Sequence, residues 1–368
     1  MIVCGSYEGG LHGWDEAWAL RFSFVAHTGC VRTVAVLKSK KLLVSGGDDE
    51  TMRIFSLKSL KQIGEAACSS TVTSLAFCGE GHVLSACADG TIKVWRLADW
   101  ACVHVLGGHK GSVPSVASHP SGRMALSTGV DRTLRLWDLT AGRCAFITRT
   151  KGAASLARWS ADGGRFLAAI GGLVQVRDVT KSASETVVAV DHDTRVLDAL
   201  FLDAETFVTA DAAGVLRVWT VGGERAWLRR RPDGARVKAL ALAGDALVAA
   251  TSDGVVETWR IRELGDADDP PEATAVVSTR LTCIAECVTE PGGRRRSPAE
   301  AATAAAAVSS EADSASGPEQ KEKKQLKLPR KAAAAAAATE QQKGSATERR
   351  RMRLKAKIRD KNNKRRRI

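Results

Sequence analysis

Short runs of apolar residues, separated by turn residues, repeat along most of the chain. In residues 106–140, apolar positions alternate through 113–118, a His-Pro-Ser-Gly turn follows, and a second run occupies 124–127. A third run begins after Asp131 and closes on Trp137-Asp138. Runs of this length between turn residues predict three β-strands. Because one such unit cannot bury its own faces, the pattern also predicts several copies packed side by side.

The copies recur with a period of 40 to 42 residues. The residues that close the third run of each copy are Trp14, Phe55, Trp95, Trp137, Arg177, Trp219 and Trp259. Six positions earlier five copies carry an acidic residue, namely Glu8, Asp49, Asp89, Asp131 and Asp253. The small or hydroxyl-bearing residue ten positions before the closing one is missing only from the copy that ends at Arg177. This period and register are typical of WD40 repeats, and seven copies predict a seven-bladed β-propeller.

The first copy lacks its first strand, because Trp14 comes only 14 residues into the chain. Residues 280–285, RLTCIA, resemble such a strand, but no closing residue follows them. We therefore expect 275–288 to pair with 1–15, so that one blade contains both ends of a propeller domain spanning 1–288. Closing the ring in this way leaves no open sheet edge.

Composition and charge change after residue 288. Residues 289–345 are of low complexity, rich in Ala, Ser and Glu, and are predicted to be a disordered linker. Residues 346–368 form a basic tail that we expect to be disordered alone and able to become helical on a partner. Together, 289–368 hold 22 Lys and Arg against 9 Asp and Glu, a net charge of +13 that equals the charge of the whole chain. Residues 1–288 are therefore neutral overall.

The positive charge of the tail is concentrated in two clusters. These clusters are predicted to direct nuclear and nucleolar targeting and to contact RNA phosphates: Arg349, Arg350, Arg351, Arg353, Lys355, Lys357, Lys364, Arg365, Arg366 and Arg367. Since no aromatic residues lie among them, we expect the RNA contact to be non-specific and sensitive to salt. The alternative is a tail that is merely solvated.

A few side chains in the repeats have the composition of a reactive site. His109, Ser127 and Asp131 resemble a hydrolase triad, but their counterparts recur in another repeat, and a catalytic site would occur once. We predict that they form buried structural tetrads, since buried polar groups need partners: His109, Ser127, Asp131 and Trp137, and again His27, Ser45, Asp49 and Phe55. The metal-like Asp191-His192-Asp193 is interpreted in the same way, because His192 aligns with the other two histidines.

The sequence shows none of the motifs that mark common enzymes or cofactor sites. There is no phosphate-binding loop, dinucleotide-binding glycine pattern, H-E-x-x-H or C-x-x-C motif. We therefore expect no catalytic residue, metal or cofactor, and reduced cysteines. No apolar stretch is long enough for a transmembrane helix, so we expect a soluble protein that has no contact with a membrane.

The detail of the blades goes beyond a general WD40 pattern. The segment HKGSVPSVASHPSGRMALSTGVDRTLRLWDLTAGRCAFI, the W-S-x-x-G that follows it, the opening VCGSYEGGLHGW, the RLTC near 280 and the basic C-terminus resemble the p21-activated-kinase-interacting protein 1 family. The yeast relative of that family is the maintenance-of-killer WD protein. This resemblance implies a nucleolar factor in maturation of the large ribosomal subunit. In animals it also implies binding and inhibition of a p21-activated kinase.

These observations favour a scaffold that is not an enzyme. We expect a monomeric propeller that docks pre-60S ribosome assembly proteins, with a tail that contacts pre-rRNA, in the nucleus and nucleolus. One alternative is a negative regulator that binds a p21-activated kinase directly. A further alternative is a substrate receptor of a ubiquitin ligase.

Overall fold

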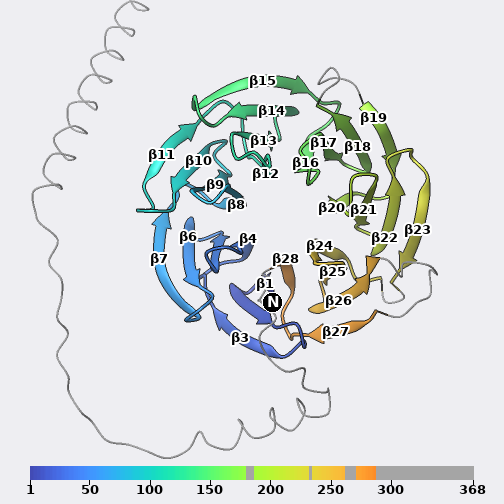
Figure 1. Ribbon diagram of the computed structural model, residues 1–368, viewed down its shortest axis with the longest axis horizontal. Helices are drawn as coiled ribbons and strands as arrows, with labels where there is room; N and C mark the ends of the chain where they lie inside the picture. Colours follow the sequence, from blue (N-terminus) through green and yellow to red (C-terminus); the bar gives the residue numbers. More distant parts are fainter. Residues whose placement is uncertain (180–185, 232–233, 262–270, 287–368) are drawn as a thin grey trace, which may run out of the picture. The chain divides into compact units, whose positions relative to one another are not determined.

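Seven four-stranded antiparallel sheets surround a central axis in the computed structural model (Figure 1). The structure describes residues 1–179, 186–231, 234–261 and 271–286, and these residues contain no α-helix. We number the sheets as blades 1 to 7, blade 2 being the one that begins at β4. The all-β seven-bladed propeller predicted from the sequence is confirmed.

In each blade the strands follow one another from the axis to the rim (Figure 1). From blade 1 to blade 7, the innermost strands are β28 (Leu281–Glu286), β4 (Val31–Leu37), β8 (Val72–Cys78), β12 (Ser115–Ser118), β16 (Ala154–Trp159), β20 (Val196–Phe201) and β24 (Val237–Ala243). In the same order, the second strands are β1 (Ile2–Ser6), β5 (Leu42–Gly47), β9 (His82–Cys87), β13 (Met124–Thr128), β17 (Arg165–Ile170), β21 (Thr206–Asp211) and β25 (Ala246–Thr251).

The third strands carry the closing residues of the repeats. They are β2 (Gly10–Trp14), β6 (Thr51–Ser56), β10 (Ile92–Arg96), β14 (Thr133–Asp138), β18 (Leu173–Asp178), β22 (Val215–Thr220) and β26 (Val255–Arg260). The outermost strands are β3 (Leu20–Val25), β7 (Lys61–Ala67), β11 (Cys102–Leu106), β15 (Arg143–Arg149), β19 (Thr186–Asp191), β23 (Arg225–Arg230) and β27 (Ala273–Val276).

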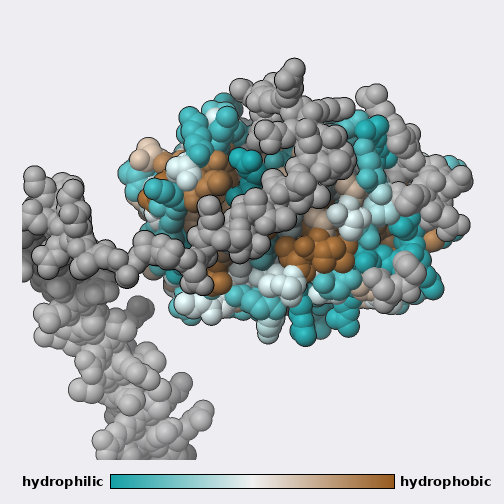
Figure 2. Space-filling view, turned by 90° about the horizontal axis from the view of Figure 1, so that it is seen from below, coloured by the Kyte–Doolittle hydropathy of each residue, from teal (hydrophilic) through white to brown (hydrophobic). Residues whose placement is uncertain are grey.

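The hydrophobic core lies between neighbouring blades. Val44 of blade 2, for example, packs in one cluster with Val72 and Val83 of blade 3, and none of the three is exposed. Second strands are covered by a blade on each side, which is why they consist largely of small and apolar residues. The rim is covered on one side only. The part of the rim seen in Figure 2 therefore shows apolar patches beside polar ones. Val25 of β3 and Val276 of β27 are among the exposed apolar side chains of the rim strands.

Blade 1 combines strands from both ends of the described chain. β28 pairs antiparallel with β1, with Val3 opposite Ala285 and Gly5 opposite Cys283. The shared segment is shorter than the 275–288 expected from the sequence. Ala275 and Val276 belong instead to β27, which pairs with β26 and forms the rim of blade 7. The pairing of the two ends is confirmed and only the start of the C-terminal segment differs, because the rim strand of blade 7 has too weak an apolar pattern to be predicted from the sequence.

The predicted linker 289–345 and basic tail 346–368 lie outside the described residues. Contacts divide the chain into two units, Met1–Ala305 and Ala306–Ile368. Everything that follows on geometry concerns the described part of the first unit.

Candidate functional site

The four residues predicted as a tetrad in blade 4 form one chain of hydrogen bonds. The indole N–H of Trp137 donates to Ser127 Oγ at 2.8 Å. Ser127 Oγ lies 2.7 Å from His109 Nε2, and His109 Nδ1 lies 3.1 Å from Asp131 Oδ1. Because Trp137 can only donate, the hydroxyl proton of Ser127 is free to bond Nε2, which leaves Nδ1–H for the carboxylate. The chain joins the segment that precedes β12 to β13 and β14 at one end of the blade.

Burial and hydrogen bonding set the charges of this tetrad. Burial lowers the pKa of His109, although Asp131 opposes the effect, so the ring is neutral near pH 7. Burial also acts to raise the pKa of Asp131, but hydrogen bonds from the Lys110 amide, Thr133 and His109 outweigh it and bring it to about 2. The pair is therefore a neutral imidazole beside a carboxylate.

Blade 2 has the same arrangement except at the closing residue. His27 Nε2 lies 2.7 Å from Ser45 Oγ, and His27 Nδ1 lies 2.9 Å from Asp49 Oδ1. Phe55 has no hydrogen-bond donor and instead packs in the core, with its ring centroid 5.4 Å from that of Phe24. Three of the four predicted residues are thus hydrogen-bonded to one another, and the fourth contributes apolar contact only.

A third set occurs in blade 6, where the sequence has Ala213 at the turn. His192 Nε2 lies 2.8 Å from Thr209 Oγ1, which also accepts from Trp219 Nε1 at 3.1 Å. In place of the missing turn carboxylate, His192 Nδ1 donates to the carbonyl oxygen of Gly172 at 3.0 Å. Both ring nitrogens of His192 are therefore hydrogen-bonded within the protein, one to its own blade and one to the preceding blade.

The tetrads do not offer a nucleophile to a substrate. Ser127 and Ser45 have no exposed surface, and Ser127 Oγ is held between an indole and an imidazole. Within the described residues, no group of His, Cys, Asp and Glu side chains has the arrangement of a metal site. The same part of the chain contains no helix that is long and apolar enough to cross a membrane. Its eight cysteines are unpaired.

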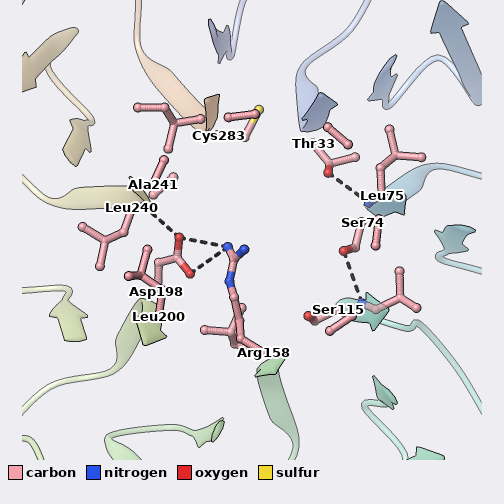
Figure 3. Close-up of a pocket in the computed structure, with 18 of the residues that line it drawn as sticks. Thr33, Ser74, Leu75, Ser115, Arg158, Asp198, Leu200, Leu240, Ala241 and Cys283 are labelled. Carbon is pink, nitrogen blue, oxygen red and sulfur yellow. Dashed lines mark hydrogen bonds and ion pairs between the residues drawn. The ribbon is translucent and has the colours of Figure 1, made fainter. Parts of the chain in front are cut away.

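A cavity of about 660 Å³ runs along the axis and is lined by the innermost strands. Polar side chains around it join one blade to the next (Figure 3). Thr33 Oγ1 accepts from the Leu75 amide at 3.0 Å, and Ser74 Oγ accepts from the Val116 amide at 3.2 Å. Ser115 Oγ continues the series in blade 4 by accepting from the Ala157 amide at 3.3 Å. The cavity wall is therefore a belt of hydrogen bonds between blades.

The belt changes character in blade 5, where Leu156 takes the place of a hydroxyl-bearing residue. Arg158 Nη2 lies 3.1 Å from Asp198 Oδ1 of blade 6, and Asp198 Oδ2 accepts from the Leu240 amide of blade 7 at 2.8 Å (Figure 3). The side chain of Asp198 is 5% exposed. One buried carboxylate thus connects three successive blades, beginning with the blade that has lost its closing tryptophan.

The basic residues predicted for targeting and RNA contact, Arg349 to Arg367, lie outside the described residues. The structure therefore places the tetrads and the axial cavity, and leaves the tail as an expectation from the sequence. Neither the belt around the cavity nor the Arg158–Asp198 pair was found from the sequence. Their partners are about 40 residues apart and meet only through the register between blades.

Comparison with known proteins gives the family. The model "WD domain, G-beta repeat" matches residues 18–56, 58–96 and 100–138. The chain is 33% identical to "p21-activated protein kinase-interacting protein 1-like" of Xenopus laevis over 299 residues, which covers 77% of this chain and 80% of that relative. The Danio rerio protein of the same name is 31% identical over 82% of this chain and 83% of its own.

A fungal relative matches a shorter part of the chain. "Shk1 kinase-binding protein 15" of Schizosaccharomyces pombe is 33% identical over 153 residues, which is 39% of this chain and 44% of that protein. The vertebrate matches span most of both chains, and the WD40 repeats of this chain form part of the propeller described above. The chain therefore belongs to the p21-activated protein kinase-interacting protein 1 family of WD40 scaffolds.

Proposed function

We propose that this protein is a non-catalytic scaffold in the nucleolar maturation of the large ribosomal subunit and in pre-rRNA processing. The observation that carries the proposal is the division of charge along the chain. Residues 1–288 contain equal numbers of basic and acidic residues, and the whole net charge of +13 belongs to 289–368. A neutral propeller suits the docking of proteins, whereas a cationic appendage suits the polyanionic RNA of a ribosomal precursor.

The propeller supplies a rigid platform for assembly proteins of the pre-60S particle. Its ring is closed by β28 and β1, and its blades are joined by the belt of hydrogen bonds around the axis. The basic clusters of the tail supply nuclear and nucleolar targeting and non-specific contact with rRNA. The resemblance noted from the sequence supports the same role, because it implies a nucleolar factor of the large subunit.

A second candidate function is direct binding of a p21-activated kinase, which would place the protein in kinase regulation. It is favoured by the names of the vertebrate relatives and of the fission yeast relative, all of which refer to binding a kinase. A role as substrate receptor of a ubiquitin ligase has no comparable observation in its favour.

Sedimentation separates the two candidates. Extracts from cells that express the tagged full-length chain are fractionated on sucrose gradients, and each fraction is probed for the protein, for precursors of the large-subunit rRNA and for p21-activated kinase. The proposal expects the protein to sediment with the precursors and to leave those fractions when RNA synthesis is blocked. If the protein stays in the light fractions and co-purifies with the kinase instead, the ribosomal proposal is wrong.

A further inference from the structure

Three successive blades carry an arginine at the same place, immediately before the innermost strand. These are Arg195 before β20, Arg236 before β24 and Arg280 before β28, and all three are exposed. Blades 6, 7 and 1 are neighbours around the axis (Figure 1). In blades 2, 3 and 5 the residues at this place are uncharged, namely Cys30, Thr71 and Ala153, and the equivalent residue of blade 4 is Ser112, which lies shortly before β12.

A repeated backbone hydrogen bond shows that these positions are equivalent. In each case the backbone amide of a residue in the turn after the second strand donates to the carbonyl oxygen of the residue before the innermost strand. The Ala212 amide donates to Arg195 at 2.8 Å, the Ser252 amide to Arg236 at 2.9 Å and the Tyr7 amide to Arg280 at 2.8 Å; blades 2, 3 and 4 repeat this bond from Asp48 to Cys30, from Ala88 to Thr71 and from Val130 to Ser112. The three arginines therefore lie on one face of the ring.

A fourth cation lies beside them. Lys238 of β24 lines the axial cavity, and its pKa is lowered by burial and by the positive charges of Arg236 and Arg195. We call Arg195, Arg236, Lys238 and Arg280 the cationic arc. Like charges placed this close together repel one another, and such a cluster is usually balanced by carboxylates or by a bound anion.

Within the described residues, the arc has no carboxylate partner of its own. Across from its arginines stand Ala212, Ser252 and Tyr7, whereas in blade 2 Asp48 neutralises Arg32 at 2.7 Å. Nearby acidic residues are already paired: Asp253 with Arg231 at 3.4 Å, and Asp211 with the buried Arg217. Opposing charges near the arc come from Glu8, exposed beside Tyr7, and from the exposed Asp191 and Asp193 shortly before Arg195.

We propose that the cationic arc binds the phosphate backbone of single-stranded RNA. Cations that recur at the spacing of the blades fit a ligand that is itself a chain of negative charges better than they fit a single anion. Arginine binds phosphate oxygens through two parallel hydrogen bonds. Tyr7, the only tyrosine of the chain, is 58% exposed at the Arg280 end of the arc and offers a ring on which a base can stack.

This inference extends the proposed function and rests on it for the choice of RNA over an acidic protein. It differs from the expectation for the tail, because it places a second RNA contact on the propeller itself. Tail and arc would then hold one RNA at two points, and each would contribute separately to the dependence of affinity on salt.

The test is salt-dependent binding of a labelled 20-nucleotide oligouridine by the full-length chain, followed by fluorescence anisotropy. The arc variant is Arg195→Gln, Arg236→Gln and Arg280→Gln. Its matched control removes three exposed cations in or next to the turns of the opposite face: Lys61→Gln, Arg123→Gln and Arg143→Gln. All of these side chains are exposed, so we expect both variants to fold, and equal melting temperatures check this.

Each phosphate contact with a single strand contributes about 0.7 to the slope of log affinity against log salt. Losing three contacts should therefore flatten the slope of the arc variant by about 2, whereas the control variant should keep the slope of the wild type. Tyr7→Ala should lower affinity by at least about fivefold, the loss of one stacked base. Equal slopes for the arc and control variants would overturn the proposal. A polyglutamate peptide that displaces the RNA at equal charge concentration would also overturn it, in favour of an acidic protein ligand.

The RNA-binding measurements on the arc variants do not test the proposed function, which the sucrose-gradient experiment tests separately. If the protein sediments with pre-60S particles and the arc variant binds RNA normally, only the inference about the arc fails. If the arc variant binds RNA poorly but the protein never enters those particles, only the proposed function fails.

Discussion

Replacing Asp131 by alanine tests whether the blade tetrads hold the propeller together. The Asp131 carboxylate accepts hydrogen bonds from the Thr133 hydroxyl at 2.7 Å, the Lys110 amide at 2.9 Å and His109 Nδ1 at 3.1 Å. The His109 side chain has no exposed surface, so without Asp131 its Nδ1–H would keep only the longer contact to Thr133 Oγ1 at 3.2 Å. An unsatisfied buried group costs about 1–3 kcal/mol. We expect Asp131→Ala to lower the free energy of unfolding by about 2–3 kcal/mol.

The lowered pKa of Asp131 leads to a similar value for the loss of unfolding free energy. Its lowering from 3.8 to about 2 in the folded protein means that folding favours the ionised carboxylate by about 2 kcal/mol. Because the folded pKa lies below the unfolded one, this stabilisation is present above about pH 4 and is lost as the pH falls toward 2. The difference in stability between the wild type and Asp131→Ala should shrink over that interval.

Urea unfolding followed by tryptophan fluorescence measures the effect, since Trp137 belongs to the same tetrad. Asp138→Ala is the matched control. That carboxylate also accepts from nearby groups, including the Thr140 hydroxyl at 2.6 Å, but it lies at the other end of β14, where water can replace it. We expect a clearly smaller shift for the control. An unchanged urea midpoint for Asp131→Ala at pH 7 would refute the structural role of the tetrad.

Three further predictions concern the ring as a whole. Burial lowers the pKa values of His27, His109 and His192 below 6.5, so the unfolded chain binds more protons than the folded one below that pH. The free energy of unfolding should therefore fall as the pH is lowered from 7 to 5, and a flat profile would contradict neutral rings. Asp198→Ala should lower the free energy of unfolding by about 3 kcal/mol or more, because it leaves Arg158 and the Leu240 amide without their partner. Ser74→Ala removes one neutral hydrogen bond of the belt and should lower it by about 1 kcal/mol. Equal losses of the two variants in urea unfolding would contradict the bridging role of Asp198. A chain that ends at residue 270 lacks β27 and β28 and should lose cooperative unfolding by calorimetry, whereas a melting curve like that of the full chain would show that closure by β28 is dispensable.

The repeats were predictable from the sequence because their signals are local. The residue spacing alone brought together His109, Ser127, Asp131 and Trp137, since each occupies a fixed place relative to the turns of its own repeat. The rim strands were harder to recognise. In β15, for instance, most side chains are exposed and none is fully buried, so its sequence RCAFITR lacks the apolar run of an inner strand.

Contacts between blades could not be predicted in the same way. Ser115 and Ala157, or Arg158 and Asp198, meet only because neighbouring blades share a register around the axis. The cationic arc has the same origin, since Arg195, Arg236 and Arg280 are about 40 residues apart in the sequence and lie on neighbouring blades because β20, β24 and β28 pack side by side. Sequence periodicity predicts the blade, whereas the surface that a partner meets depends on how blades are arranged around the ring.

The central claim is that the neutral propeller and the basic tail carry separate functions, and the most direct test is the localisation of a chain that lacks residues 346–368. The deletion removes both basic clusters and none of the described strands, so the melting temperature of the purified protein should match that of the full chain. In cells, fluorescence microscopy should show the truncated protein largely in the cytoplasm, and attaching 346–368 to an unrelated cytoplasmic reporter should carry that reporter to the nucleolus. Nucleolar accumulation of the truncated protein at the level of the full chain would contradict the account and would mean that the propeller itself is the targeting element.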